Sequence, residues 1–101
     1  MKPRRDAMTR DEAENVALQG LTFIAADPQR LVRFLSLTGL TPNDLKGWGD
    51  DPTLAIAVLD YLLSDESLLL VFVTDKGLKP EMVAPAHALL SGGDGRDWHS
   101  T

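Results

Sequence analysis

The chain has 101 residues, which is room for one domain, and it lacks cysteine, which excludes disulfides, zinc–thiolate sites and a cysteine nucleophile. Its 44% of apolar residues is typical of a globular protein, and its longest strictly apolar run, Leu68 to Val73, is too short to span a membrane. The net charge of −5 makes nucleic acid an unexpected partner, because an acidic protein repels phosphates.

The charge divides the chain into a basic start and an acidic body. The first ten residues carry a net charge of +3, and the remaining residues carry −8. We expect residues 1–8 to form a flexible basic tail, residues 9–91 to form one helical domain, and residues 92–101 to form a flexible tail. No apolar segment follows the basic residues, so we do not expect a signal peptide. Together with the lack of cysteine, this favours a cytoplasmic protein.

Residues 10–26 have the pattern of an amphipathic helix. Thr9 and Glu12 stand at the spacing of a capping box, in which each side chain accepts a hydrogen bond from the other residue's backbone N–H. Apolar or small residues then recur at helical spacing and predict the buried face of the helix. The residues of this face are Val16, Gly20, Phe23 and Ile24.

Prolines and glycines mark the ends of the later helices. Three prolines follow an aspartate or threonine that can act as N-cap, and a proline is tolerated in a first helical turn because its missing N–H has no helical partner there. These pairs are Asp27-Pro28, Thr41-Pro42 and Asp51-Pro52. Gly39 and Gly77 stand where left-handed C-caps are expected. These signals predict helices at 28–38, 42–47, 52–63, 65–76 and 80–91. Pro85 should bend or split the last of them.

The apolar run Leu68–Val73 fits a buried strand as well as a helix, and a weak internal repeat favours the helix. When residues 16–45 are aligned with residues 54–83, eight of thirty positions are identical, whereas about two would be expected from composition. The period is 38, and the matched pairs include Phe34/Phe72, Gly39/Gly77 and the conservative pair Phe23/Tyr61. Two related three-helix units would explain the pattern, and so would convergence of capped amphipathic helices.

The segment 52–63 is apolar nearly all round, with Asp60 as its one mid-helix charge. Helices of this kind are buried on most sides. We therefore expect 52–63 and 65–76 to form the centre of the fold. The predicted fold is an all-α, compact bundle of five to six short helices, arranged as two related three-helix units.

The two units differ where a partner could bind. Arg30 and Arg33 lie on one face of their helix, whereas Leu68 and Val71 occupy the matching positions of the second unit. The last helix either covers these two apolar residues or leaves them as an exposed patch for an unidentified protein partner or a second copy of the chain. Trp48, between two glycines, is either a core plug or an exposed anchor. The candidate interaction surface is therefore Leu68, Val71 and Trp48, with Arg30 and Arg33 as a charged rim.

The sequence carries no catalytic motif. His87 and His99 lack the spacing of metal ligands, and the acidic pairs stand at helix starts, where capping explains them. We therefore expect no enzyme, no catalytic residue, no metal and no cofactor. Residues 31–48 have the order of a helix-turn-helix, so the alternative is a nucleic-acid-associated regulator that uses this segment and the basic N-terminus. A third hypothesis is an enzyme that uses His87 with nearby carboxylates.

The order of the punctuation motifs is similar to that of a known family. The segments LQGLTFIAADPQRLVRFLSLTGLTPNDL, DPTLAIAVLDYLLSDESLLLVFV and GLKPEMV resemble a family of short alphaproteobacterial proteins classed as a domain of unknown function. The resemblance covers residues 12–90 and implies a small soluble helical protein. It supplies no activity, ligand or catalytic residue that could be carried over to this chain. The leading hypothesis is a small non-enzymatic protein-interaction module or adaptor of the bacterial cytoplasm.

Overall fold

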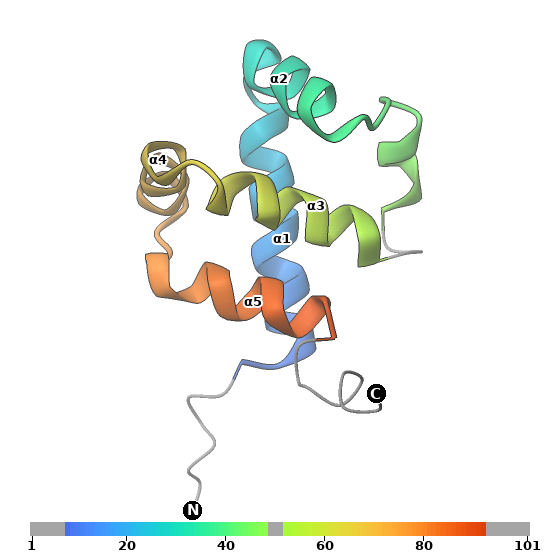
Figure 1. The fold of residues 1–101 in the computed structure, drawn as a ribbon. Coiled ribbons are helices and arrows are strands. Elements are labelled where there is room, and N and C mark those ends of the chain that lie inside the picture. The colour runs from blue at the N-terminus through green and yellow to red at the C-terminus, as the bar shows by residue number, and fades with distance from the viewer. Residues whose placement is uncertain (1–7, 49–51, 93–101) are drawn as a thin grey trace, which may run out of the picture.

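The structure, a computed structural model, describes residues 8–48 and 52–92. Within these residues it contains five α-helices, two short 3-10 helices and no strand (Figure 1). The α-helices are α1 (Arg10–Ala25), α2 (Pro28–Thr38), α3 (Pro52–Leu63), α4 (Glu66–Lys76) and α5 (Val83–Leu90), and the 3-10 helices are η2 (Asp44–Gly47) and η3 (Pro80–Met82). The predicted all-α bundle is confirmed, and the ambiguous run Leu68–Val73 is helical. Among the helices of the described residues, none is both long and apolar enough to span a membrane.

Side-chain caps begin the helices where the sequence predicts them. Thr9 Oγ1 accepts a hydrogen bond from the Glu12 N–H at 3.1 Å, and the Thr9 N–H donates to Glu12 Oε1 at 2.9 Å, so the capping box is formed. Asp27 and Asp65 accept hydrogen bonds from N–H groups in the first turns of α2 and α4, at 3.0 and 3.1 Å. The predicted Asp51 cap and most of the two predicted tails lie outside the described residues.

Glycines end α2 and α4 in the left-handed conformation that the sequence predicts. Gly39 has φ 78° and Gly77 has φ 69°, a region that favours glycine because it has no Cβ. The N–H of Leu78 then donates to the carbonyl oxygen of Val73 at 2.8 Å, which turns the chain back toward α4. Leu78 packs against the core, which is the hydrophobic contact that commonly accompanies such a cap.

The predicted helix at 42–47 is instead a single 3-10 turn. The side chain of Thr41 caps Asp44 as expected, since Thr41 Oγ1 accepts from the Asp44 N–H at 3.2 Å. The N–H groups of Leu45 and Lys46 then donate to carbonyls three residues earlier. Short helical turns of this kind commonly have the tighter 3-10 winding.

The predicted helix at 80–91 opens with the 3-10 turn η3 and continues as α5. The change from one winding to the other falls at Met82–Val83, three residues before the proline that was expected to bend or split the helix. Pro85 is the third residue of α5, where a backbone N–H has no intrahelical partner. The missing N–H of Pro85 therefore removes no hydrogen bond from α5.

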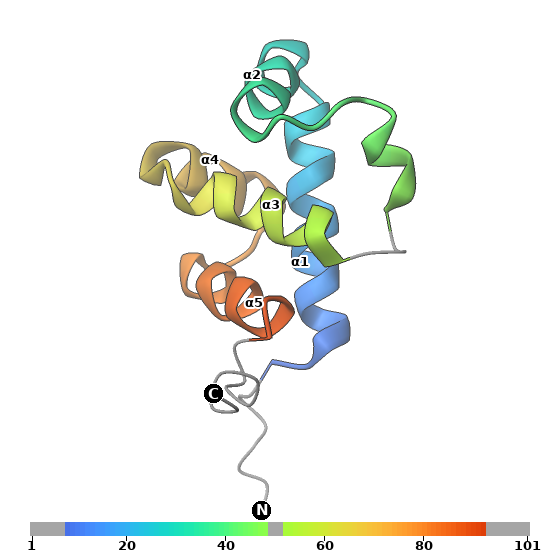
Figure 2. The ribbon, with the colours of Figure 1, turned by 45° about the vertical axis from the view of Figure 1, so that its right-hand side comes forward.

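The centre of the fold is made by α1, α3 and α5. Both α3 and α5 cross α1, while α2 lies at one end of α1 and α4 lies at the edge of the bundle (Figures 1 and 2). The expectation that 52–63 would be central is confirmed, but the same expectation for 65–76 is wrong. The short helix α5 occupies the central place, because Val83, Ala86 and Leu90 form one apolar face that is buried against α1 and α3.

Gly20 lets α1 and α3 approach closely where they cross. A Cβ atom at this position would lie 2.9 Å from Cγ1 of Val58 and 2.9 Å from Cδ1 of Leu62, which is closer than carbon atoms tolerate. Both of these α3 side chains are fully buried. Gly20 and Val58 are also equivalent positions in the 38-residue alignment.

The aromatic side chains pair across the two aligned segments in a reciprocal way. Phe23 of α1 packs against Phe72 of α4, with ring centres 5.4 Å apart. Phe34 of α2 packs against Tyr61 of α3, with ring centres 5.3 Å apart. In the alignment, Phe23 corresponds to Tyr61 and Phe34 corresponds to Phe72. The second aromatic residue of each segment therefore packs on the first aromatic residue of the other segment. Units related by a two-fold axis make contacts of this kind, while the duplication itself stays a prediction.

Candidate interaction surface

The five predicted surface residues lie in different environments. Leu68 and Trp48 are partly buried and pack against the core. Val71 is 51% exposed, and Arg33 is exposed. Arg30 is only partly exposed, because its guanidinium turns toward α1. The five residues therefore do not form one continuous exposed surface.

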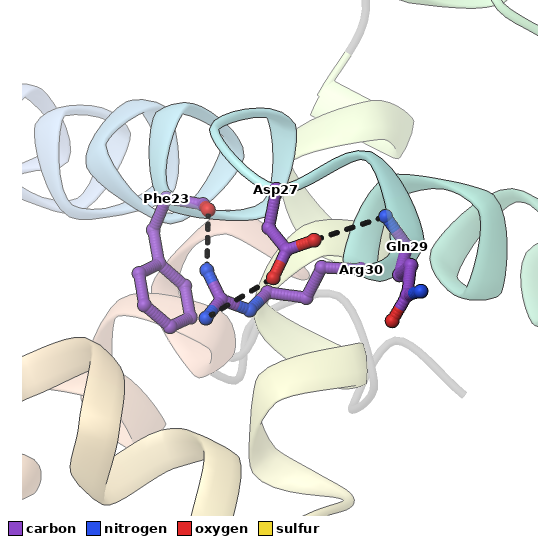
Figure 3. Close-up of polar contacts among 4 residues, drawn as sticks. All are labelled: Phe23, Asp27, Gln29 and Arg30. Atoms are coloured by element: carbon purple, nitrogen blue, oxygen red, sulfur yellow. Dashed lines mark hydrogen bonds and ion pairs between the residues drawn. The ribbon is translucent and has the colours of Figure 1, made fainter.

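Arg30 joins α2 to the end of α1. Its guanidinium carbon lies 4.0 Å from the centre of the Phe23 ring, and its Nη1 donates a hydrogen bond to the Phe23 carbonyl oxygen at 3.0 Å (Figure 3). Its Nη2 lies 3.8 Å from Oδ2 of Asp27. The other carboxylate oxygen of Asp27, Oδ1, accepts a hydrogen bond from the Gln29 N–H and so caps the start of α2. One side chain thus makes a cation–π contact, a charged hydrogen bond and an ion pair.

These contacts explain why an arginine stands at this position. The last four carbonyls of a helix have no partner within it, and they carry the negative end of the helix dipole. The last turn of α1 contains no basic residue, so Arg30 supplies the cation from the following helix. Arg30 therefore stabilises the corner between α1 and α2 and contributes little to the outer surface.

Several apolar side chains outside the predicted interaction surface are exposed. Val32 is 62% exposed and Leu37 is 68% exposed, both on α2, and Leu70 of α4 is 46% exposed. The sequence contains a signal for Val32 alone. Phe34 is the buried position of α2, and Val32 falls outside the stripe that repeats three or four residues from it, whereas Leu37 falls on that stripe and is exposed nonetheless.

The outer face of α2 is one continuous stripe, which we call the α2 surface. Its residues recur every three or four positions and are all exposed: Gln29, Val32, Arg33, Ser36 and Leu37. A shallow open depression of about 310 Å³ lies on it, lined by Pro28, Gln29, Val32 and Arg33. The lining is mostly apolar, and Arg33 is one of the lining residues.

The outer face of α4, the α4 surface, carries exposed residues at helical spacing: Ser67, Leu70, Val71 and Thr74. The exposed carboxylates Glu66 and Asp75 flank it, four residues from Leu70 and from Val71. The last helix was expected either to cover Leu68 and Val71 or to leave them exposed. In the structure α5 packs mainly on α1 and α3, so Leu68 is covered in part by the core and Val71 stays half exposed.

The other candidate sites are His87, a metal site and the helix-turn-helix segment. Nε2 of His87 lies 3.6 Å from a carboxylate oxygen of Asp60, and the Asp60 side chain is 76% exposed. The described residues contain no cluster of three or more His, Asp or Glu side chains that could hold a metal ion. In the helix-turn-helix alternative, the element in the place of a recognition helix is η2, a single turn that carries Asp44 and Lys46. His99 lies outside the described residues.

Comparison with known proteins places the chain in a family. A family described as "Protein of unknown function (DUF3572)" matches residues 10–93. The chain belongs to this family. The match spans all five helices of the described residues, and it confirms the resemblance to a domain of unknown function that the sequence motifs carry. No curated protein and no solved structure matches this DUF3572 chain.

Proposed function

We propose that this DUF3572 protein is a small non-enzymatic protein-interaction module or adaptor of the bacterial cytoplasm. The observation that supports the proposal is the exposure of large apolar side chains on two neighbouring positions of α4 and two positions of α2. These side chains are Val32, Leu37, Leu70 and Val71, which are 62, 68, 46 and 51% exposed. Grouped apolar side chains on a small protein are typical of surfaces that bind other proteins.

The composition of α4 adds to this support. Residues 68–73 of α4 are all apolar, and a helix that is apolar on every side is normally buried on every side. Here only one side of α4 is covered, with Phe72 and Val73 as its buried residues. A partner that covers Leu70 and Val71 would complete the burial.

No observation favours the nucleic-acid alternative to the same extent. The two cations of α2 do not both face outward, because Arg30 is held against Phe23. The η2 turn places an acidic residue, Asp44, at its start, which opposes phosphate binding. The experiment below tests protein binding directly and includes nucleic acid as an outcome.

Substitutions on the two surfaces test the proposal. The variants Leu70→Ser/Val71→Ser and Val32→Ser/Leu37→Ser should fold, because all four side chains are exposed. Each variant is used as bait in native cytosol, and its mass in solution is measured by light scattering. The control is Leu18→Ser, since Leu18 is 44% exposed and belongs to α1, not to either surface.

We expect at least one surface variant to lose a bound protein or a self-association that the wild type and Leu18→Ser retain. The proposal is wrong if both surface variants keep every captured protein and the same mass as the wild type. Capture of nucleic acid alone, lost on nuclease treatment, would support the regulator in its place.

A further inference from the structure

We propose that the α2 surface binds an acidic amphipathic helix of a partner protein. The inference rests on the proposed function and adds the chemistry of the partner and the side chains that recognise it. Val32 and Leu37 would contact the apolar face of the incoming helix, and Arg33 would pair with a carboxylate at its edge.

The positive charge of α2 indicates that the partner's contacting residues are negatively charged. The helix contains two arginines and no acidic residue, although the whole chain carries a net charge of −5. Arg30 is already satisfied by Phe23 and Asp27. Arg33, one turn later and exposed, makes no ion pair among the described residues. A free guanidinium beside exposed apolar side chains is complementary to a carboxylate on an apolar helix face.

The shape of the α2 surface fits a helix. Gln29 and Leu37, at the two ends of the stripe, are about 12 Å apart along the axis at 1.5 Å per residue. That length matches about two turns of a partner helix, which presents side chains at intervals of three and four residues. The depression beside Val32 and Arg33 has a volume of about 310 Å³, which is room for an apolar side chain of the partner.

The same charge argument disfavours a symmetric second copy. If two molecules paired through their α2 surfaces, Arg33 of each would approach the basic face of the other, and no carboxylate lies on that face to compensate. The α4 surface is flanked by the exposed carboxylates Glu66 and Asp75, so its charge does not favour an acidic partner. An unlike protein that supplies the acidic residues is therefore the occupant that the α2 surface favours.

A selection from a displayed library tests the inference on the full chain. The probe is a library of helix-forming peptides of about 15 residues, the length at which an isolated helix begins to be stable. The wild-type protein and Val32→Ser/Leu37→Ser are used as separate targets, and their thermal unfolding midpoints are compared first. Enriched peptides are then titrated by fluorescence anisotropy against the wild type, Arg33→Glu and Leu18→Ser.

We expect the wild type to enrich peptides with apolar residues at helical spacing and flanking Asp or Glu. Their Kd should rise about tenfold or more for Val32→Ser/Leu37→Ser and for Arg33→Glu, and should be unchanged for Leu18→Ser. Replacing the peptide's acidic residues by Lys should restore binding to Arg33→Glu, because the two charges are exchanged.

Three results would overturn the inference. These are no enrichment over Val32→Ser/Leu37→Ser, enrichment of basic peptides, and acidic peptides whose Kd is unchanged in both α2 variants. Failure of this inference can be distinguished from failure of the proposed function. If native partners are lost only with Leu70→Ser/Val71→Ser, the protein is an interaction module that binds through the α4 surface.

Discussion

Arg30 and Arg33 stand three residues apart on α2, and the structure gives them different surroundings. The Arg30 side chain is 26% exposed and contacts the ring and carbonyl of Phe23, whereas Arg33 is exposed and makes no ion pair among the described residues. A charged hydrogen bond to a carbonyl in a partly buried place is worth more than a solvated charge. The two arginines should therefore contribute differently to the free energy of unfolding, which can be measured.

We expect Arg30→Met to lower the free energy of unfolding by about 2 kcal/mol, because it removes a charged hydrogen bond and a cation–π contact. Arg33→Met should change it by less than about 0.5 kcal/mol, as is usual for surface substitutions. Arg30→Lys should recover only part of the loss, since an ammonium lacks the planar fork that stacks on the ring while it bonds to the carbonyl. Urea unfolding of the three variants checks this order, and equal losses for Arg30→Met and Arg33→Met would contradict it.

At the scale of helices, the crossing of α1 and α3 depends on the absence of a side chain at Gly20. In Gly20→Ala, the added methyl group would lie 2.9 Å from Val58 and Leu62, in a part of the core that cannot move freely. Helix propensity favours alanine by about 1 kcal/mol, but overpacking costs about 1–3 kcal/mol. We expect Gly20→Ala to be destabilising by about 1 kcal/mol in urea unfolding.

The matched experiment is a double-mutant cycle with Val58→Ala. This substitution removes Cγ1 of Val58, one of the two atoms that the new methyl group would meet. The double variant should therefore be more stable than the sum of the two single effects predicts, by about 1 kcal/mol. Ser36→Ala, at an exposed position inside α2, controls for the propensity of alanine alone. Additive effects would show that Gly20 does not set the approach of the two helices.

The helix ends were predictable because their signals are local. The caps at Thr9 and Asp27 and the left-handed glycines at 39 and 77 act within one turn, and the structure forms each of them. The choice between an α-helix and a 3-10 turn at 42–47 was not predictable from the cap at Thr41, because the same cap can begin either winding.

Contacts between helices were harder to predict than their ends. The apolar composition of α4 indicates burial but does not say on which side, so the sequence predicts this helix at the centre, where the structure has α5. Likewise, the sequence predicts Arg30 at the rim of a surface, because its spacing within α2 shows which face of that helix it occupies but not which residue of another helix it contacts. Its partner, Phe23, belongs to the preceding helix, and that contact follows from the turn between α1 and α2.

For the whole molecule, the reciprocal aromatic pairs couple the two aligned segments. Phe72 of α4 packs on Phe23 of α1, and Phe34 of α2 packs on Tyr61 of α3, so neither segment completes its core alone. A chain built this way should unfold as one cooperative unit, because loss of either pair exposes both segments. This holds whether the segments arose by duplication or by convergence.

We expect Phe72→Leu to weaken hydrogen-exchange protection in both segments by the same amount. The substitution leaves part of a fully buried aromatic site empty, and its cost of about 1–3 kcal/mol lowers the global free energy of unfolding. The slowest amides of α1 and of α3 should therefore exchange faster by the same factor, since both exchange through global opening. Phe34→Leu is the matched variant and should give the same uniform change, although Phe34 belongs to the other segment. If Phe72→Leu accelerates exchange in α3 and α4 while α1 keeps its protection, the two segments are separate cooperative units and the reciprocal contacts do not couple them.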